Sequence, residues 1–281
     1  MVNILILSIY WNPPKEIVSW PLPFLGRPLL WYGFFFALGF FLAYRIFQLL
    51  LVERGHDKKE AKQVAEKASL FIGIAMIAGA RLFEMLFYQR PSVYLEDPLE
   101  LLRFWEGGLS SHGAVIGILV GLWLLQRKWK ERFSWRNLLD LLVIPGLVAG
   151  SCIRIGNFFN QEIFGTVSTL PWAVLFGTPA DGSAPLPRHP VQLYEALFYL
   201  FLAALLWKKR LFLETAGKLS GLFFICCFSF RFCIEFLKTN QSALIPFGFP
   251  LDMGQLLSLP LILLGLLLIK KSKGTVSVER N

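Results

Sequence analysis

The residues best suited to chemistry in this chain directly follow an apolar run over 138–149. Within nine positions the chain places one arginine, two asparagines, one glutamine and one glutamate, namely Arg154, Asn157, Asn160, Gln161 and Glu162. At membrane depth a charged side chain costs several kcal/mol unless it is paired or lines a wet cavity. On a helix that continues, Arg154, Asn157 and Gln161 share one face. The pattern favours a functional site over a polar patch that only holds helices together, because such a patch rarely needs an arginine.

More polar side chains stand at the ends of other apolar runs. Arg231 and Glu235 are four residues apart near the end of one run, so they share a helix face. His112 opens another run, and the adjacent Gly113 permits close approach of a substrate. Histidine is the side chain whose unperturbed pKa suits proton transfer near neutral pH. A further histidine, His189, precedes a proline at the start of a later run.

Arginines inside apolar runs, with carboxylates one helical turn away, suit an anion that is held in a membrane. The planar guanidinium grips a phosphate at two points, and the most abundant anion embedded in membranes is a phospholipid headgroup. Such pairs can also be internal ion pairs with a structural role, and for Arg81 and Glu84 this alternative stays open. The four cysteines have no metal-ligand spacing with a histidine and are interpreted as small apolar filler. We therefore expect these cysteines to form neither disulfides nor a zinc site.

The elements that must position these residues are membrane helices. The chain has 281 residues, 55% of them hydrophobic, and a mean hydropathy of +0.56. Its apolar runs predict an all-α integral membrane protein with about seven transmembrane helices. These are expected at 29–52, 68–88, 113–126, 138–154, 192–207, 219–237 and 251–269. We expect one polytopic membrane domain over 1–281, without a separate soluble domain.

Basic residues concentrate on alternate connections between the predicted helices. The connections at 53–67, 127–136 and 208–218 and the tail at 270–281 are rich in lysine and arginine, whereas the intervening connections are not. Since cytoplasmic loops carry the excess of basic residues, the N-terminus is predicted outside and the C-terminal tail in the cytoplasm. Topology thus accounts for the net charge of +9, and we expect no nucleic acid partner.

Three connecting segments carry further expectations. The segment 1–28 is predicted on the outer surface, and so is the loop at 157–190, which is rich in proline and glycine. This longest connection is typical of a lid or a binding loop, and we expect its part 165–190 to move during turnover. The inner connection at 53–67 alternates charges at helical spacing, which predicts a short solvated helix.

Six segments of the chain, in order, resemble the prolipoprotein diacylglyceryl transferase family. They are 31–33, 107–113, 154–165, 188–195, 231–236 and 253–260, and together they extend over nearly the whole chain. The segment 154–165 is the most specific of them. The resemblance implies seven spans with the N-terminus outside, which agrees with the interpretation of the basic residues.

The resemblance implies an enzyme of the bacterial cytoplasmic (inner) membrane that acts in the first step of lipoprotein maturation. Such an enzyme transfers the diacylglyceryl group of phosphatidylglycerol to a cysteine thiol in the lipobox of a preprolipoprotein signal peptide. The product is a thioether, and glycerol 1-phosphate leaves. The implied partners are phosphatidylglycerol, the lipobox and the surrounding membrane lipids, with no metal and no cofactor.

The resemblance also implies roles for single residues. His112 matches the histidine often assigned as the base for the thiol, and Arg154 and Arg231 match arginines that stabilise the departing phosphate. The residues implied in binding and positioning the headgroup are Tyr32, Asn157, Asn160, Glu162, Gly165, His189 and Glu235. Whether His112 or an arginine-assisted substrate phosphate accepts the thiol proton stays open.

The chain departs from the family pattern at three places. Ala114 stands where a second glycine usually follows the histidine, and Lys238 stands where arginine is usual. Thr239 and Asn240 replace the usual proline and aspartate. Lysine lacks the fork that holds a phosphate at two points, so a substrate contact at Lys238 stays open.

Three other functions fit parts of this pattern. A transporter or channel for a small anion would also place arginines in its spans, but it predicts internal repeats or broken helices, and the sequence contains no repeat. A metal-dependent headgroup enzyme needs clustered aspartates, whereas Asp140, Asp181 and Asp252 are far apart in the sequence. A non-catalytic scaffold would not need the polar residues. The transferase is therefore the preferred interpretation.

Overall fold

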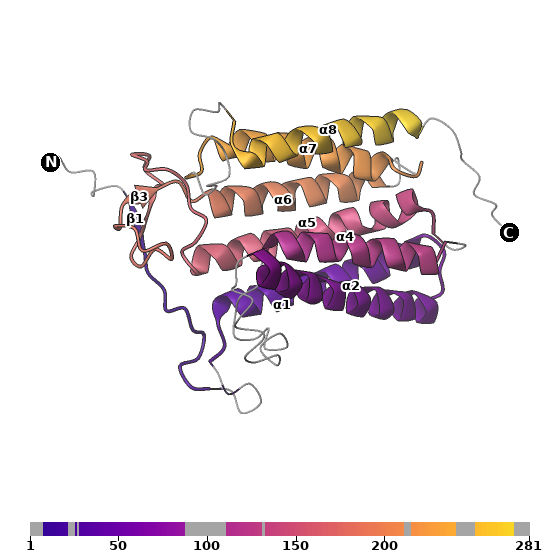
Figure 1. The fold of residues 1–281 in the computed structure, drawn as a ribbon, viewed down its shortest axis with the longest axis horizontal. Helices are drawn as coiled ribbons and strands as arrows, with labels where there is room; N and C mark the ends of the chain where they lie inside the picture. Colours follow the sequence, from indigo (N-terminus) through magenta and orange to yellow (C-terminus); the bar gives the residue numbers. More distant parts are fainter. Residues whose placement is uncertain are drawn as a thin grey trace. The chain divides into compact units, whose positions relative to one another are not determined.

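The computed structural model describes residues 8–21, 26, 28–87, 111–130, 133–210, 215–239 and 251–272. Within these residues the chain forms seven helices and three short strands (Figure 1). The helices are α1 (Trp31–Glu53), α2 (Lys58–Phe87), α4 (Ser111–Lys128), α5 (Trp135–Phe159), α6 (Val191–Lys209), α7 (Lys218–Glu235) and α8 (Met253–Lys271). The strands are β1 (Ile9–Trp11), β2 (Val174–Phe176) and β3 (Pro187–Arg188).

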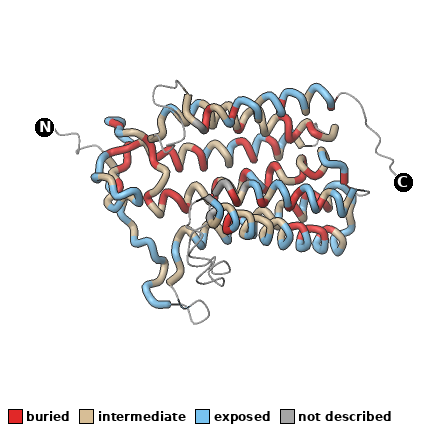
Figure 2. Tube along the Cα trace, viewed as in Figure 1, coloured by how far each residue is buried: buried red, intermediate tan, exposed pale blue. Residues whose placement is uncertain are grey.

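The helices confirm the predicted all-α membrane fold. Each predicted span coincides with one helix of the described chain, and five of these helices are long and apolar enough to cross a membrane, namely α1, α2, α5, α6 and α8. Large apolar side chains such as Leu197 and Phe201 stay exposed on α6, and exposed positions recur along the helices (Figure 2). Lipid tails suit such a surface, which in water would promote aggregation. The number of spans and their orientation stay predictions.

The prediction of a separate short helix at 53–67 is wrong. Its charged residues from Lys58 onward form the first turns of α2, which continues without a break into the apolar second span, whereas Glu53 ends α1. The Asp57 carboxylate accepts a hydrogen bond from the Lys59 backbone N–H at 2.9 Å and so caps the start of α2. Lys62 and Glu66 pair one turn apart at 3.8 Å. No proline stands between 58 and 87, so nothing ends the helix where its charged part meets its apolar part.

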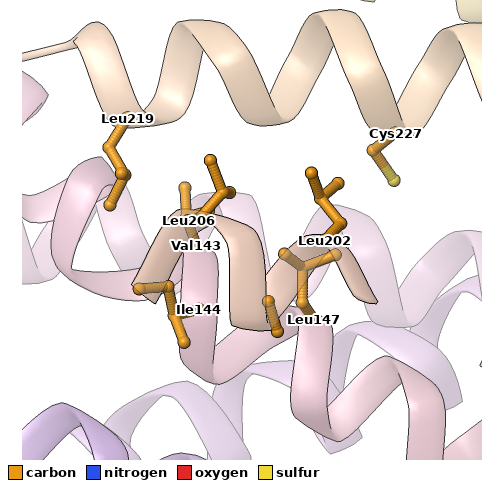
Figure 3. Packing of buried hydrophobic residues seen from close by; sticks show 8 residues of the cluster. Val143, Ile144, Leu147, Leu202, Leu206, Leu219 and Cys227 are labelled. Carbon is orange, nitrogen blue, oxygen red and sulfur yellow. The ribbon is translucent and has the colours of Figure 1, made fainter. Parts of the chain in front are cut away.

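The described chain divides into two compact units, one of residues 1–46 and 139–281 and the other of residues 47–138. One hydrophobic core of the first unit is made by α5, α6 and α7 (Figure 3). Its buried residues are Val143, Ile144, Leu147, Leu202, Ala203, Leu206, Leu219 and Cys227. These side chains determine which faces of the three helices meet. Each helix packs its apolar face against the apolar faces of the other two, because this buries the side chains.

The start of α7 is capped from another helix of the same unit. Asp140 on α5 is buried, and its carboxylate accepts hydrogen bonds from the backbone N–H groups of Gly217 at 2.6 Å and Ser220 at 2.7 Å, and from the Ser220 hydroxyl. A helix start leaves N–H groups without intrahelical partners. Asp140 thus satisfies donors of α7 that water cannot reach.

Replacing Asp140 by alanine is expected to lower the free energy of unfolding by about 3 kcal/mol, because buried N–H groups lose their acceptor. Thermal unfolding of the purified protein in detergent measures the loss. Ser134 is the matched control, since it accepts a bond from the exposed Asn137 N–H at 3.2 Å, and Ser134→Ala is expected to cost about 1 kcal/mol. Equal losses in the two variants would contradict the buried cap.

A three-stranded sheet ties the first described residues to the predicted outer loop. The strand β1 pairs in parallel with β2, with Ile9 opposite Val174, and β2 pairs antiparallel with β3, with Val174 opposite Arg188. No strand is predicted from the sequence of this loop. The prolines and glycines of the loop predict turns. Strands of two and three residues are too short to show the alternation of apolar and polar side chains by which strands are predicted.

Gln161 does not share a face with Arg154, contrary to the prediction for a continuing helix. The helix α5 ends at Phe159, and Gln161 adopts a φ of 53° in the turn that follows. Its fully buried amide donates to the side chains of Asn12 at 3.0 Å and Thr178 at 2.9 Å. Gln161 therefore connects the end of α5 to the sheet segments.

In the second unit, α2 and α4 pack closely through glycines. A Cβ added to Gly113 would lie 2.3 Å from the carbonyl oxygen of Gly79, and one added to Gly117 would lie 2.1 Å from that of Ala75. Small residues of this kind let helix backbones approach each other. Because Gly113 has no side chain, the backbone of α2 can pack against it. The prediction from the sequence was that Gly113 allows close approach of a substrate.

Candidate active site

A fully buried glutamate lies at the centre of the polar residues in the first unit. Glu195, in the second turn of α6, has its Oε2 2.8 Å from Nε of Arg154 on α5. Its Oε1 lies 2.7 Å from Nζ of Lys238 and 3.6 Å from Nη1 of Arg231 on α7. A buried carboxylate is stable only when it is well paired. Here one carboxylate gathers cations from three parts of the chain.

The packing of α5, α6 and α7 produces this convergence. Arg154 stands near the end of α5, and Tyr199, one helical turn after Glu195, interacts through its hydroxyl with the Arg154 guanidinium. Arg231 and Glu235 stand one turn apart at the end of α7, with Nη2 and Oε2 4.0 Å apart. The predicted shared face of Arg231 and Glu235 is thus confirmed.

A hydrogen-bonded row continues from Arg154 past the end of α5. Arg154 Nη1 donates to Asn157 Oδ1 at 3.1 Å, and Asn157 Nδ2 donates to Glu162 Oε1 at 2.6 Å. Asn160 Nδ2 reaches the same Glu162 oxygen at 3.5 Å. Gln192 Nε2, buried on α6, donates to the Glu162 carbonyl oxygen at 2.7 Å and holds the turn. The helix end therefore directs three predicted residues toward Arg154.

Tyr32 joins the same group from the start of α1. Its ring packs where Gly156 has no side chain, since a Cβ there would lie 3.1 Å from Tyr32 Cδ2. Its hydroxyl is near enough to Glu162 and Arg154 to interact with both charges. The aromatic ring thus brings a hydroxyl to the row of polar side chains.

Lys238 belongs to the ion network. It follows α7, its side chain is 7% exposed, and its Nζ also lies 3.5 Å from Glu235 Oε2. Burial lowers the pKa of the Lys238 ammonium, and the adjacent Glu195 carboxylate opposes that shift. A point charge is sufficient for a single short contact to Glu195, so this position does not need the arginine fork.

Gly165 and His189 lie where the loop at 157–190, predicted on the outer side, meets the end of α7. Gly165 pairs with Lys238 in an antiparallel bridge, and its N–H donates to the His189 carbonyl oxygen at 2.9 Å. A Cβ on Gly165 would lie 2.6 Å from the Leu237 carbonyl oxygen and 2.7 Å from His189 Cβ. Glycine is required here because three backbone segments crowd together. His189 Nδ1 lies 3.4 Å from the Tyr194 hydroxyl.

The charges are arranged unevenly between buried and accessible groups. The Glu195 side chain is 0% exposed, whereas the side chains of Arg154 and Arg231 are 19% and 31% exposed. Among the described side chains, Oε2 of Glu195 and Oε2 of Glu235 receive no aligned hydrogen bond, although cations lie close to both. Guanidinium donors from two helices thus remain accessible while their counter-charge is buried. Such an arrangement can bind an anion.

The first unit brings together every predicted site residue except His112. His112 stands in the first turn of α4, in the second unit, and its side chain lies outside the described residues. The side chain of Glu84 also lies outside them, and its predicted partner Arg81 is buried. Asn240 lies outside them as well. The described residues contain no group of three His, Cys, Asp or Glu side chains that could hold a metal.

No role is predicted from the sequence for Glu195, Tyr199 or Gln192. Glu195 stands inside a predicted span, and a carboxylate at membrane depth is by itself a sign of a functional or paired group. That sign could have identified Glu195. Tyr199 and Gln192 gave no comparable signal, because uncharged polar residues are common at helix contacts.

Comparisons with known proteins agree on one family. The family model described as prolipoprotein diacylglyceryl transferase matches residues 22–270. A protein of Tolumonas auensis, named phosphatidylglycerol–prolipoprotein diacylglyceryl transferase, is 40% identical over 265 residues, which cover 93% of this chain and 96% of the relative. Proteins of the same name from Chlamydia trachomatis and Protochlamydia amoebophila are 39% and 34% identical. These matches cover 92% and 93% of this chain and 96% and 94% of the relatives.

Proposed function

The chain belongs to the prolipoprotein diacylglyceryl transferase family, and we propose that it transfers the diacylglyceryl group of phosphatidylglycerol to the lipobox cysteine of preprolipoproteins. The thiolate sulfur forms a bond to the glyceryl carbon that carries the phosphate ester, and the bond from that carbon to oxygen breaks. The products are a thioether and glycerol 1-phosphate. The whole chain acts as one multi-pass domain of the bacterial cytoplasmic membrane, with 1–28 and 157–190 outside and 270–281 in the cytoplasm.

The observation that carries this proposal is the pair of accessible guanidinium groups held by one buried carboxylate. Arg154 and Arg231 come from different helices and meet at Glu195. Together they can hold a phosphodiester and stabilise the charge that develops on the leaving phosphate oxygen. Because Glu195 holds the arginines before substrate binds, little reorganisation is needed during the reaction.

The other predicted residues position this pair and the headgroup. Asn157 and Glu162 orient Arg154 through the hydrogen bonds described above, and Asn160 supports Glu162. Glu235 holds Arg231, and the Tyr32 hydroxyl donates to the headgroup. Gly165 and His189 keep the outer loop against the end of α7, at the edge of the headgroup site.

His112 is proposed as the base that takes the thiol proton. In that case we expect kcat/KM for the peptide to rise with pH, because only the neutral imidazole accepts a proton. We expect His112→Ala to abolish this rise together with most of the rate. Unchanged rate and pH dependence would instead assign the proton to the substrate phosphate, assisted by an arginine.

A two-substrate assay tests the proposed function. Purified protein in detergent receives phosphatidylglycerol and a lipobox peptide with either cysteine or serine at the reacting position. We expect mass spectrometry to find a diacylglyceryl adduct on the cysteine peptide alone, together with free glycerol phosphate. No adduct, under conditions where an established transferase works, would favour the anion transporter instead.

A further inference from the structure

The segment 253–260 resembles the family, yet the site described so far gives it no part. It forms the first turns of α8, which lie against the end of α7. A Cβ added to Gly254 would lie 2.5 Å from Cδ and from Oε1 of Glu235, and 2.8 Å from Oε2. Atoms cannot approach so closely without a shift. The Glu235 carboxylate therefore occupies the space that any side chain at Gly254 would need.

Gln255 prevents the first turn of α8 from moving away. Its side chain is almost completely buried, its Oε1 accepts from the Asp252 N–H at 3.0 Å, and its Nε2 donates to the Phe232 carbonyl oxygen at 3.4 Å. The first bond closes a capping box at the start of α8, and the second joins α8 to the last turns of α7. The backbone at Gly254 is thus held against α7.

We propose that Gly254 is a positioning residue, whose missing side chain sets where the Glu235 carboxylate lies and hence how Arg231 presents its guanidinium to the substrate phosphate. Glu235 Oε2 lies 4.0 Å from Arg231 Nη2 and 3.5 Å from Lys238 Nζ, and both cations also contact Glu195. A displaced Glu235 carboxylate would release Arg231 on one side. This inference rests on the proposed transferase function.

Gly254→Ala tests the inference, because its effects on folding and on catalysis should separate. The clashing atoms are the far end of a flexible side chain, so the chain can fold by rotating Glu235, and we expect the thermal midpoint to stay near that of the wild type. The displaced carboxylate no longer holds Arg231, and we expect kcat/KM for phosphatidylglycerol to fall about 100-fold.

Gly265→Ala is the matched control at the same pair of helices. A Cβ on Gly265 would lie 2.8 Å from the Gly221 carbonyl oxygen and 2.9 Å from Ile225 Cγ1. Here a backbone atom cannot rotate away, so we expect a lower thermal midpoint with an unchanged transfer rate per folded molecule. The two glycines should therefore show opposite effects.

A compensating change distinguishes positioning of Glu235 from general packing of α8. Aspartate is shorter than glutamate by one methylene group, so Glu235→Asp should relieve the clash with an alanine at 254. We expect the double variant to transfer faster than Gly254→Ala alone, although Glu235→Asp by itself is slower than the wild type. A double-mutant cycle measures this coupling.

The outcomes separate the two proposals. Gly254→Ala with wild-type kcat/KM, or a loss that Glu235→Asp does not relieve, would overturn the role of Gly254 while leaving the transferase intact. A wild-type protein that transfers nothing in the two-substrate assay would overturn the proposed function, and the positioning role would fall with it.

Discussion

Replacing Arg154 or Arg231 by alanine is expected to slow diacylglyceryl transfer by about 100- to 1,000-fold. Each guanidinium is partly exposed beside the buried Glu195, so each can donate to the phosphate at which charge develops. The rate of adduct formation on the lipobox cysteine, measured by mass spectrometry at saturating peptide, reports the loss. Arg231→Lys should lose less than Arg231→Ala, because lysine keeps the charge but not the fork.

Arg45 provides the matched control for these variants. It is an exposed arginine within α1 and takes no part in the ion network around Glu195. We expect Arg45→Ala to reach the membrane and to transfer at the wild-type rate. Wild-type rates for both Arg154→Ala and Arg231→Ala would show that the reacting phosphate binds elsewhere.

Replacing Glu195 by glutamine is expected to damage both stability and catalysis. The change keeps the shape of the side chain but removes the negative charge that lies next to Arg154, Arg231 and Lys238. Breaking a buried ion pair in this way costs about 3 to 5 kcal/mol, because unpaired charges stay buried. The repelling cations also lose their orientation. We expect a lower thermal midpoint in detergent and a transfer rate reduced at least as strongly as in the arginine variants.

Two further variants make the Glu195 experiment specific. Glu66→Gln removes a glutamate that pairs with Lys62 on the exposed face of α2, and we expect its stability to change by about 0.5 kcal/mol or less. Adding Lys238→Met to Glu195→Gln removes one of the uncompensated cations, so part of the lost stability should return. If Glu195→Gln melts and transfers like the wild type, the carboxylate is not the centre of the site.

Local spacing along the chain was sufficient to predict the helices and part of the site. Apolar runs of bilayer length identified the segments that form helices, because a helix can satisfy all of its own backbone hydrogen bonds in lipid. The spacing of Arg231 and Glu235 predicted their shared face, and the spacing of Arg154 and Asn157 predicted theirs. These relations depend only on the helical period, so no knowledge of other helices was needed.

Helical spacing does not predict which residues lie together beyond the point where the backbone leaves the helix. Gln161 was expected on the face of Arg154, but the left-handed turn after Phe159 directs it to Asn12 and Thr178. The strand β1 pairs with β2 across more than 150 residues of sequence, and strands of three residues carry too little pattern to reveal such a partner.

Only the tertiary structure decided which distant residues meet. Glu195 contacts Arg154 and Lys238, 41 and 43 residues away, because the buried faces of α5, α6 and α7 pack into one core. The contact of Gly254 with Glu235 likewise depends on how α8 packs against α7. Sequence determined which side chains each helix offers and on which face, since those follow from residue type and helical period. Packing determined which offered side chains share a site, because it depends on the shapes of all the buried surfaces at once.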